Sequence, residues 1–421
     1  MKFKPFSNKQ LKVLTWWKVP KIASKYSAII ADGSVRSGKT VSMSISFIIW
    51  AMTEFSDCNF AICGKTVGSC RRNVIKPLIN MLQGRYNIKD KHSENLLIIT
   101  KGGKTNYFYI FGGRDESSQD LIQGVTLAGV FFDEVALMPR SFVEQALARC
   151  SVTGSRFWFN CNPESPSHWF YKEWIQKSED KHALRLKFMM DDNLSLSKEV
   201  KERYYNLYTG TFFRRFILGE WVVAEGLVYQ FFNNDIENYL YKEDTSKLQG
   251  AWYISIDYGT VNPFSAGLWC VTQQFAVRVD EYYFNSREEG WQKTDEEHYA
   301  EIEKLAAGRN IEYLVVDPSA ASFINTVSRH GKYTVWHANN DVINGIRTTA
   351  GMLKSRKARI AANCTAAINE FGLYSWDEKA VGRDAVIKTN DHAMDDIRYF
   401  CYTVLSNEYY YEEYADEIKK T

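Results

Sequence analysis

The stretch SAIIADGSVRSGKTVSMSISFIIWAM, residues 27–52, joins an apolar strand, a glycine-rich turn and an apolar helix. Its centre, GSVRSGKT, fits the pattern GxxxxGK followed by Ser or Thr. In such a loop the backbone amides point at phosphates, the lysine reaches the β and γ phosphates, and the last hydroxyl holds magnesium. We therefore predict a nucleotide-phosphate loop made of Gly33, Ser34, Val35, Arg36, Ser37, Gly38, Lys39 and Thr40. The alternative, an ordinary glycine turn before a core helix, is disfavoured by the apolar strand before the loop and the all-round apolar helix after it.

Around this loop, short β-rich runs alternate with helical stretches over residues 27–165. The runs are SAIIAD, NFAICGK, NLLIIT, NYFYIFGG, AGVFFDE and SRFWFNCNP. This alternation is typical of a doubly wound α/β sheet. A second series begins at WYISIDYG, residues 252–259. With 421 residues, 45% of them hydrophobic, the chain is long enough for two cores, so we predict an α/β protein of two domains.

The composition excludes several classes of protein. The net charge is +2, from 52 basic and 50 acidic residues, so any DNA-binding groove must be local. The eight cysteines form no CxxC pair and have no metal-ligand spacing, which suits a reducing compartment. The first residues lack the apolar core of a signal peptide, and the longest apolar stretch is too short to span a bilayer. We expect a cytoplasmic protein without a membrane role.

The pattern divides the chain into three parts. A nucleotide-binding domain covers residues 1–195, a connecting segment covers 196–245, and a second α/β domain covers 246–421. The connecting segment reads as helical at first and is then broken by Gly219 and Gly226. The acidic, aromatic tail NEYYYEEYADEIKKT, residues 407–421, is either a docking peptide or a solvated end.

Two acids follow another predicted strand of the first domain. The run LAGVFFDE ends on Asp133 and Glu134, where the first acid can hold the magnesium shell and the second can orient an attacking water. The alternative is that both are first-turn helix residues, which the helix dipole favours. Because a phosphate loop precedes them, we expect Asp133 to bind the cofactor and Glu134 to be catalytic.

Further polar residues could complete this site. The run FWFNCNP places Asn160 or Asn162 at the end of the next strand, where a γ-phosphate sensor would lie, although an Asn-Pro turn needs no such role. Arg36 either touches the γ phosphate or is a solvated loop charge. An arginine finger is not assigned. Arg114 and Arg149 are candidates, but nothing in the sequence distinguishes them from solvated surface charges.

In the second domain, acids stand at the ends of two apolar strands. Asp257 ends WYISID before a glycine turn, and Asp317 ends YLVVD before a proline that stops the strand. Open α/β sheets bind ligands beyond the carboxyl ends of their strands, so these two acids can converge.

A third group of acids lies in NDHAMDDIRYF, residues 390–400. Asn390 or Asp391 is a good N-cap, and an apolar stripe at helical spacing predicts a packed helix; the stripe is Ile397, Phe400, Cys401 and Val404. The helix dipole favours acids in a first turn, but neighbouring carboxylates repel one another unless a cation lies among them.

We therefore predict a divalent-metal site formed by Asp257, Asp317, His392, Asp395 and Asp396. Two shared ions would stabilise both the attacking and the leaving oxygens of a phosphodiester. The helical wheel puts Asp396 at the border of the apolar stripe, nearer the sheet, and Asp395 further round with His392. Three unrelated surface acids are the alternative.

The combination of a P-loop, Glu134 directly after Asp133, two strand-end aspartates and a helix with DHxxD resembles the large terminase subunit of tailed bacteriophages and prophages. Further matches are KTVGSCRRNVI, GEWVVAEGLVY and INGIRTTAGML. The resemblance covers nearly the whole chain. It implies an N-terminal P-loop ASCE ATPase domain and a C-terminal RNase H-like nuclease domain that uses Mg²⁺ or Mn²⁺.

Several residue roles follow from this resemblance. The family's Walker B aspartate matches Asp133 and its catalytic glutamate matches Glu134. The nuclease acids match Asp257, Asp317 and Asp395, with His392 beside the third, so the resemblance favours Asp395 over Asp396 as a ligand. Gln10 matches a glutamine that reads the adenine of ATP.

The resemblance also implies partners and a place of action. These are double-stranded DNA, the portal protein of the procapsid, a small terminase subunit and a ring of identical subunits, in the bacterial host cytoplasm and on the procapsid during packaging. The alternatives are a P-loop helicase or recombination ATPase fused to a nuclease in DNA repair, and a non-catalytic assembly protein whose acids are structural.

Overall fold

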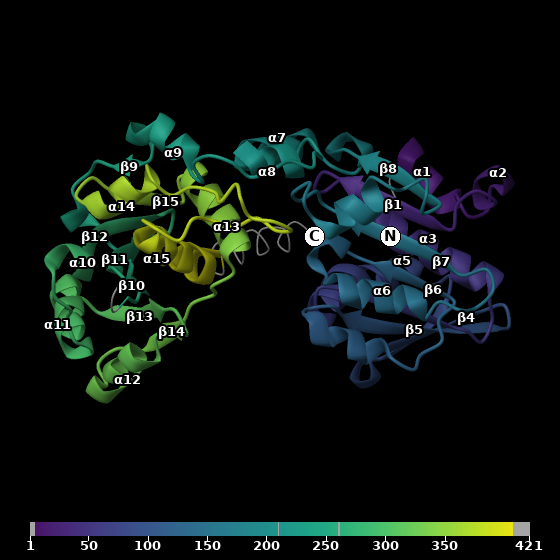
Figure 1. The fold of residues 1–421 in the computed structure, drawn as a ribbon, viewed down its shortest axis with the longest axis horizontal. Helices are drawn as coiled ribbons and strands as arrows, with labels where there is room; N and C mark the ends of the chain where they lie inside the picture. Colours follow the sequence, from purple (N-terminus) through teal and green to yellow (C-terminus); the bar gives the residue numbers. More distant parts are fainter. Residues whose placement is uncertain (1–4, 209, 260–261, 407–421) are drawn as a thin grey trace. The chain divides into compact units, whose positions relative to one another are not determined.

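The computed structural model describes residues 5–208, 210–259 and 262–406, and Figure 1 shows its elements. The predicted docking tail, residues 407–421, lies outside these ranges. The chain forms two compact units. The first contains the residues up to Tyr205 with Thr211–Val223 and Val381–Arg383, and the second contains Asn206–Gly210, Ala224–Ala380 and the residues from Asp384 onward.

The first unit is built on one sheet with the strand order β3-β4-β5-β2-β6-β7-β1-β8. Its strands are β1 (Ala28–Gly33), β2 (Asn59–Gly64), β3 (Asn87–Lys91), β4 (Leu96–Lys101), β5 (Lys104–Gly112), β6 (Gly129–Phe132), β7 (Arg156–Cys161) and β8 (Ala183–Phe188). Every predicted β-rich run forms a strand. The polar β3 and the half-exposed β8 were not predicted, because neither contains an apolar run.

Parallel pairing aligns the ends of the strands that matter for the site. From β5 to β8 all neighbouring strands run parallel, while β3 and β4 join as antiparallel hairpin strands. The carboxyl ends of β1, β6 and β7 therefore lie at one edge of the sheet. This edge brings together three segments that are far apart in the sequence, the phosphate loop, Asp133 and Asn160.

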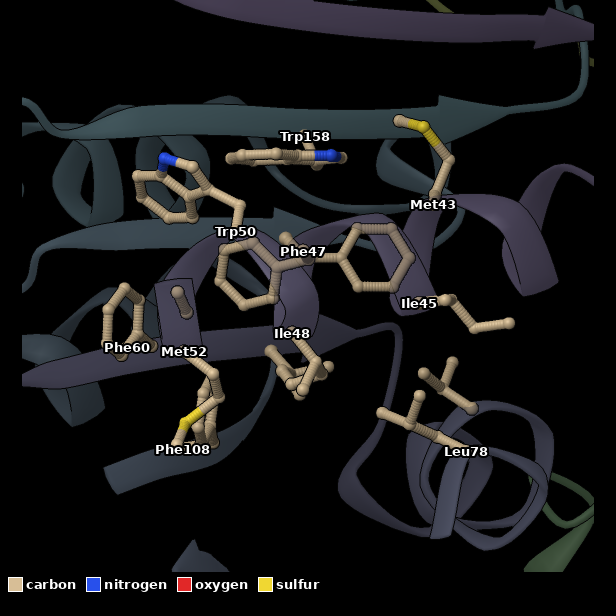
Figure 2. Close-up of a cluster of buried hydrophobic side chains, with 14 of the residues drawn as sticks. Met43, Ile45, Phe47, Ile48, Trp50, Met52, Phe60, Leu78, Phe108 and Trp158 are labelled. Atoms are coloured by element: carbon tan, nitrogen blue, oxygen red, sulfur yellow. The ribbon is translucent and has the colours of Figure 1, made fainter. Parts of the chain in front are cut away.

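Helix α3 (Lys39–Glu54) is the buried core helix that the sequence predicted. Aromatic rings pack along it against the sheet: the centroid of Trp158 lies 5.2 Å from that of Phe47 and 4.7 Å from that of Trp50 (Figure 2). The other helices before β8 are α1 (Asn8–Thr15), α2 (Pro20–Ala23), α4 (Val67–Cys70), α5 (Lys76–Leu82) and α6 (Arg140–Ala148). The predicted connecting segment contains α7 (Lys198–Leu207) and α8 (Gly210–Phe216), followed by Gly219 and Gly226 at positive φ.

The second unit has a mixed sheet with the strand order β14-β13-β10-β11-β12-β15-β9. Its strands are β9 (Leu240–Tyr241), β10 (Ala251–Asp257), β11 (Phe264–Val271), β12 (Ala276–Phe284), β13 (Ile311–Val316), β14 (Val335–His337) and β15 (Ala358–Ala361). β10, β11 and β12 are consecutive antiparallel neighbours, so the alternation predicted from WYISIDYG onward holds only after β12. β10 and β13 pair in parallel, which puts Asp257 and Asp317 at the same edge.

The helices of this unit are α9 (Gln230–Asn234), α10 (Ser286–Glu289), α11 (Asp295–Ala306), α12 (Ala321–His330), α13 (Val342–Lys354), α14 (Thr365–Phe371) and α15 (His392–Phe400). α15 packs against β10 and β11, and Asp391 is its N-cap residue. The chain continues after α15 as a further helical turn over 401–405. The predicted apolar stripe extends from α15 into this turn, and all of its residues are completely buried.

The eight cysteines are all free thiols. Within the described ranges, no helix combines the length and the apolar character needed to cross a membrane.

Candidate active sites

The phosphate loop forms at the end of β1 with the backbone geometry that its glycines allow. Gly33 and Gly38 have φ angles of 134° and 83°, values that side chains with a Cβ rarely adopt. A Cβ on Gly33 would lie 2.0 Å from the carbonyl oxygen of Phe188 in β8. α3 then begins at Lys39, so the amides of the loop stand at the start of a long buried helix, where an anion is favoured.

Lys39 is buried inside this loop. Its Nζ donates to the carbonyl oxygen of Ser34 at 2.6 Å, to that of Gly33 at 3.1 Å and to Oδ1 of Asn162 at 3.1 Å. Burial lowers the pKa of Lys39 to about 8. The ammonium group is therefore held by neutral oxygens, which a phosphate with full negative charge can replace.

The two acids after β6 join the same site through Asn160. Oδ1 of Asp133 accepts hydrogen bonds from Thr40 Oγ1 at 2.9 Å and from Asn160 Nδ2 at 2.8 Å. Oδ1 of Asn160 in turn accepts from the backbone N–H of Glu134 at 2.8 Å. Burial, with the charge of Glu134 beside it, raises the pKa of Asp133 to about 6. Of the two asparagines, Asn160 contacts the acid pair and Asn162 contacts Lys39.

Glu134 has a left-handed backbone with a φ of 59°, which is unusual for a residue with a side chain. Such conformations persist only where the surrounding structure holds them, and they concentrate at functional sites. Here the hydrogen bond from the Glu134 amide to Asn160 is one such restraint.

Arg36 and Gln10 each contact a different neighbour at the loop. Arg36 donates from Nε to the hydroxyl of Tyr204 in α7 at 2.7 Å, and its guanidinium group lies 5.6 Å from the centre of that ring. Gln10 is buried, and a Cβ on Gly38 would lie 2.4 Å from its Nε2. The sequence indicated both residues, whereas Tyr204 carried no signal beyond its place in the predicted connecting helix.

The end of α8 and the segment that follows it contact the loop and the residue before it. The backbone N–H of Val35 donates to the carbonyl oxygen of Phe216 at 2.8 Å. The buried carboxylate of Asp32, directly before the loop, accepts from Trp221 Nε1 at 3.0 Å and from Arg185 at 3.0 and 2.8 Å. These contacts were not predicted, although Asp32, an acid inside an apolar strand, was a signal in the sequence.

In the second unit, one tyrosine links the two strand-end acids. The Tyr399 hydroxyl lies 2.7 Å from Oδ2 of Asp317 and 3.5 Å from Oδ1 of Asp257. Burial raises the pKa of Asp257 to about 6. Burial opposes ionisation of Asp317 too, but hydrogen bonds from Ser319 and Tyr399 outweigh it and lower the pKa of Asp317. Tyr399 was not predicted, although it stands four residues after Asp395 and seven after His392 on one helix face.

The start of α15 brings His392 and Asp395 to the same edge. His392 Nδ1 lies 2.8 Å from Oδ2 of Asp257; burial opposes protonation of the imidazole, but this contact raises its pKa. Oδ1 of Asp395 accepts from Arg398 Nε at 3.2 Å and Nη2 at 3.0 Å, and its Oδ2 lies 3.1 Å from Lys388 Nζ. Neither cation was predicted from the sequence.

Asp396 faces the interior instead. It is completely buried between α15 and the sheet, where it forms an ion pair with Arg278 and accepts hydrogen bonds from Ser265 and, at 3.0 Å, from Ser255. Both of its carboxylate oxygens are engaged, in agreement with the helical wheel. This geometry removes Asp396 from the set of ligands that we propose below.

Glu370 is a further buried acid that sequence analysis did not identify. Its Oε2 accepts from the backbone N–H groups of Ala393 at 2.7 Å and Met394 at 3.2 Å, and its Oε1 accepts from the Tyr283 hydroxyl at 2.7 Å. Burial raises the pKa of Glu370 to about 7. The carboxylate thus satisfies free amides in the first turn of α15, the turn that carries His392.

The donor chemistry of this edge fits a hard divalent cation. Carboxylate oxygens are the ligands that Mg²⁺ and Mn²⁺ prefer, and Asp257 and Asp317 are close enough for one hydroxyl oxygen to lie between them. Among the residues that the structure describes, no three His, Cys, Asp or Glu side chains are grouped to hold a metal as they stand. Asp395, the third predicted ligand, is paired with cationic side chains.

Comparisons with known proteins found relatives of the N-terminal half of the chain and of nearly the whole chain. A family model described as "Terminase large subunit, T4likevirus-type, N-terminal" matches residues 30–236. The terminase large subunit of Escherichia phage T5 is 22% identical over 205 residues, which are 46% of this chain and 45% of the T5 protein. That alignment therefore spans less than half of the T5 relative.

Solved structures match over much more of the chain. The large terminase of a thermophilic bacteriophage is 50% identical, with a TM-score of 0.91, over 96% of this chain and 100% of that one. The structure of the same phage protein in complex with ADP is 50% identical, with a TM-score of 0.88. Its complex with ATP-gamma-S is 48% identical, with a TM-score of 0.87. Each of these two comparisons covers 95% of this chain and 100% of the other chain. Because half of its residues are identical to those of a large terminase that it covers completely, this chain belongs to the large terminase subunit family.

Proposed function

We propose that this chain is the packaging motor and endonuclease of a tailed phage or prophage. ATP hydrolysis drives double-stranded DNA into the procapsid, and a metal-dependent nuclease cuts the concatemeric DNA. The observation that carries the proposal is the presence, in one chain, of the phosphate loop joined to Asp133 and Glu134 by Asn160 and of the Asp257–Asp317 pair bridged by Tyr399. We assign hydrolysis to residues 1–195, coupling to 196–245 and cutting to 246–421.

In the nucleotide site, the loop amides and Lys39 bind the phosphates, and Gln10 contacts the adenine. Thr40 and Asp133, which lie 2.9 Å apart, would hold the Mg²⁺ that accompanies ATP. Glu134 orients the attacking water and accepts its proton. Asn160 positions Asp133 and the Glu134 backbone, and its Nδ2 also lies 3.2 Å from Thr40 Oγ1, so it joins the phosphate loop to both acids.

Coupling to DNA movement follows from the contacts of the loop. Val35 donates its amide to Phe216, and Asp32 accepts from Trp221, so phosphate binding changes the surroundings of the 211–223 segment. The chain runs on from this segment into the second unit. We infer that the change in this segment moves DNA by one step, through contacts to DNA phosphates, because a packaging motor must accept any sequence.

In the nuclease site, Asp257, Asp317 and Asp395 would hold Mg²⁺ or Mn²⁺, with His392 beside them. When bound, the ions activate water and stabilise charge on the phosphodiester oxygens. His392 orients Asp257 through its 2.8 Å contact, and Tyr399 keeps Asp257 and Asp317 together. The partners that fit this function are the portal protein, a small terminase subunit and further copies of the chain in a ring, on the procapsid in the host cytoplasm.

Reciprocal variants test the assignment of two activities to two sites. Lys39→Ala should abolish ATP turnover and leave nicking of plasmid DNA in Mn²⁺, while Asp257→Ala should abolish nicking and leave ATP turnover. The exposed residues Lys18 and Asp244 provide matched controls as Lys18→Ala and Asp244→Ala, which should keep both activities. ATP turnover by Lys39→Ala would contradict the motor assignment, and undiminished nicking by Asp257→Ala would contradict the nuclease assignment.

A second assay separates a packaging motor from a helicase. A motor that moves along intact duplex displaces a third strand from a triplex with ATP, whereas a helicase separates the strands of a tailed duplex. We expect triplex displacement without strand separation, and the reverse result would favour a helicase fused to a nuclease.

A further inference from the structure

Lys388 provides a positive charge between two acids at the start of α15. Its Nζ lies 3.1 Å from Oδ2 of Asp395 and 3.2 Å from Oδ2 of Asp391. The side chains of Asp391 and Asp395 are 6% and 9% exposed, whereas that of Lys388 is 59% exposed. Two nearly buried carboxylates thus share one ammonium group that remains in contact with solvent.

The two oxygens of Asp395 have partners of different kinds. Oδ1 is bound by Arg398, which is buried and whose aliphatic stem occupies the space left by Gly345, since a Cβ there would lie 2.6 Å from Arg398 Cγ. Oδ2 is bound by Lys388, a flexible and strongly hydrated cation. Asp395 is therefore held by a buried cation at Oδ1, and Oδ2, bound by the exposed Lys388, is the oxygen whose partner can be exchanged.

We propose that Lys388 is the resident counter-ion of the nuclease site and that a divalent cation displaces its ammonium group from Oδ2 of Asp395. The inference rests on the proposed nuclease function and extends it by assigning a role to a lysine. Lys388 neutralises the repulsion between acids while the metal is absent. A divalent ion brings twice the charge of the Lys388 ammonium group. Once displaced, Lys388 is available for another anion such as a DNA phosphate.

This exchange makes Lys388 a competitor of the metal. Removing its charge should strengthen metal binding, because the ion no longer has to break two ion pairs. We expect Lys388→Gln to lower the dissociation constant for Mn²⁺ by about three- to tenfold, the effect of losing two partly exposed ion pairs expressed as an equilibrium constant. Lys388→Arg, which keeps the charge, should bind Mn²⁺ as the wild type does or more weakly.

The test is a titration of the nucleotide-free full chain with Mn²⁺, followed by the electron paramagnetic resonance signal of the free ion. The Mn²⁺ ions that the wild type binds and Asp257→Asn does not bind are those of the nuclease site. Lys379→Gln is the matched control, because Lys379 is an exposed lysine in the same stretch before α15. It removes the same charge and should leave the Mn²⁺ affinity unchanged.

A second measurement leaves Lys388 unchanged and begins with the wild-type chain. Lysine acetylation by an activated ester, followed by mass spectrometry, should become faster at Lys388 when Mn²⁺ is added, because the ammonium group is released from the carboxylates. Acetylation of Lys379 should stay the same. In Asp257→Asn, Mn²⁺ should no longer change the reactivity of Lys388.

The outcomes separate this inference from the proposed function. If Asp257→Asn binds as much Mn²⁺ as the wild type, the nuclease metal site itself is wrong. If Asp257→Asn loses ions but Lys388→Gln binds Mn²⁺ no more tightly than the wild type, or Mn²⁺ does not speed acetylation of Lys388, the displacement of Lys388 is overturned.

Discussion

The side-chain amide of Asn160 donates a 2.8 Å hydrogen bond to Oδ1 of Asp133, and so joins the ends of β7 and β6. The Oδ1 atom of the same side chain accepts a hydrogen bond from the backbone N–H of Glu134. Asn160 is 1% exposed, so no bulk water replaces either bond when the side chain is removed. The acid pair at this edge therefore depends on one neutral residue from the neighbouring strand.

Asn160→Ala should lower the turnover number for ATP by about ten- to a hundredfold, because an unpaired buried group costs about 1–3 kcal/mol. The Michaelis constant should change less, since the phosphate loop stays intact. Steady-state ATPase kinetics measure both values. Asn73→Ala, at an exposed asparagine, is the control and should behave as the wild type. An Asn160→Ala variant with full turnover would rule out its role in positioning Asp133 and Glu134.

Tyr399→Phe should destabilise the metal-free chain by about 1–3 kcal/mol, since Asp317 loses its 2.7 Å donor and both acids lose the group between them. The loss should shrink in Mn²⁺, because the cation then takes over the contact between the acids. Urea unfolding in EDTA and in Mn²⁺ measures the difference. Tyr205→Phe changes an exposed tyrosine in the same way and should have no effect in either condition. Equal losses with and without Mn²⁺ would argue that Tyr399 is only a packing residue.

Gly345→Ala should destabilise the fold by about 1–3 kcal/mol, the usual cost of inserting a methyl group into a filled space. The new Cβ would lie 2.6 and 2.8 Å from Cγ and Cδ of Arg398, the residue that holds Asp395. The variant should therefore also bind Mn²⁺ more weakly. Gly68→Ala in α4 is the control, because a Cβ there meets nothing within 4 Å. Chemical unfolding that gives the same stability for both variants would contradict the predicted clash.

Glu370→Gln should become increasingly more stable than the wild type as the pH rises. Burial raises the pKa of Glu370 from 4.5 to about 7, so between these values the folded chain holds more protons than the unfolded chain, and stability falls with pH. Glutamine has no charge to bury, and the gain by pH 8 should be on the order of 3 kcal/mol. Urea unfolding at pH 4.5 and pH 8 measures this gain, with Glu225→Gln at an exposed glutamate as the control. A difference that is the same at both pH values would show that folding does not raise the pKa of Glu370.

The sequence by itself was enough for features that local spacing encodes. The glycines and Lys39 of the phosphate loop, the apolar strands that end at Asp133 and Asp257, and the buried stripe of α15 were all predicted. They follow from steric limits on backbone angles and from the periods of strands and helices, which act over a few residues. The meeting of Asp257 and Asp317 at one edge was also expected from a general rule for open sheets, and the parallel pairing of β10 with β13 produces it.

Only the tertiary structure decided which side chains meet. Asp395 and Asp396 are adjacent in sequence, yet Asp395 faces Lys388 at the edge of the sheet and Asp396 faces Arg278 in the interior. Tyr399 reaches Asp317 across 82 positions of the chain. Such contacts depend on how a helix is rotated against a distant sheet, and that rotation is set by the packing of many residues together. No short stretch of sequence contains that information, so the partners of each charged group emerge only when the chain is folded.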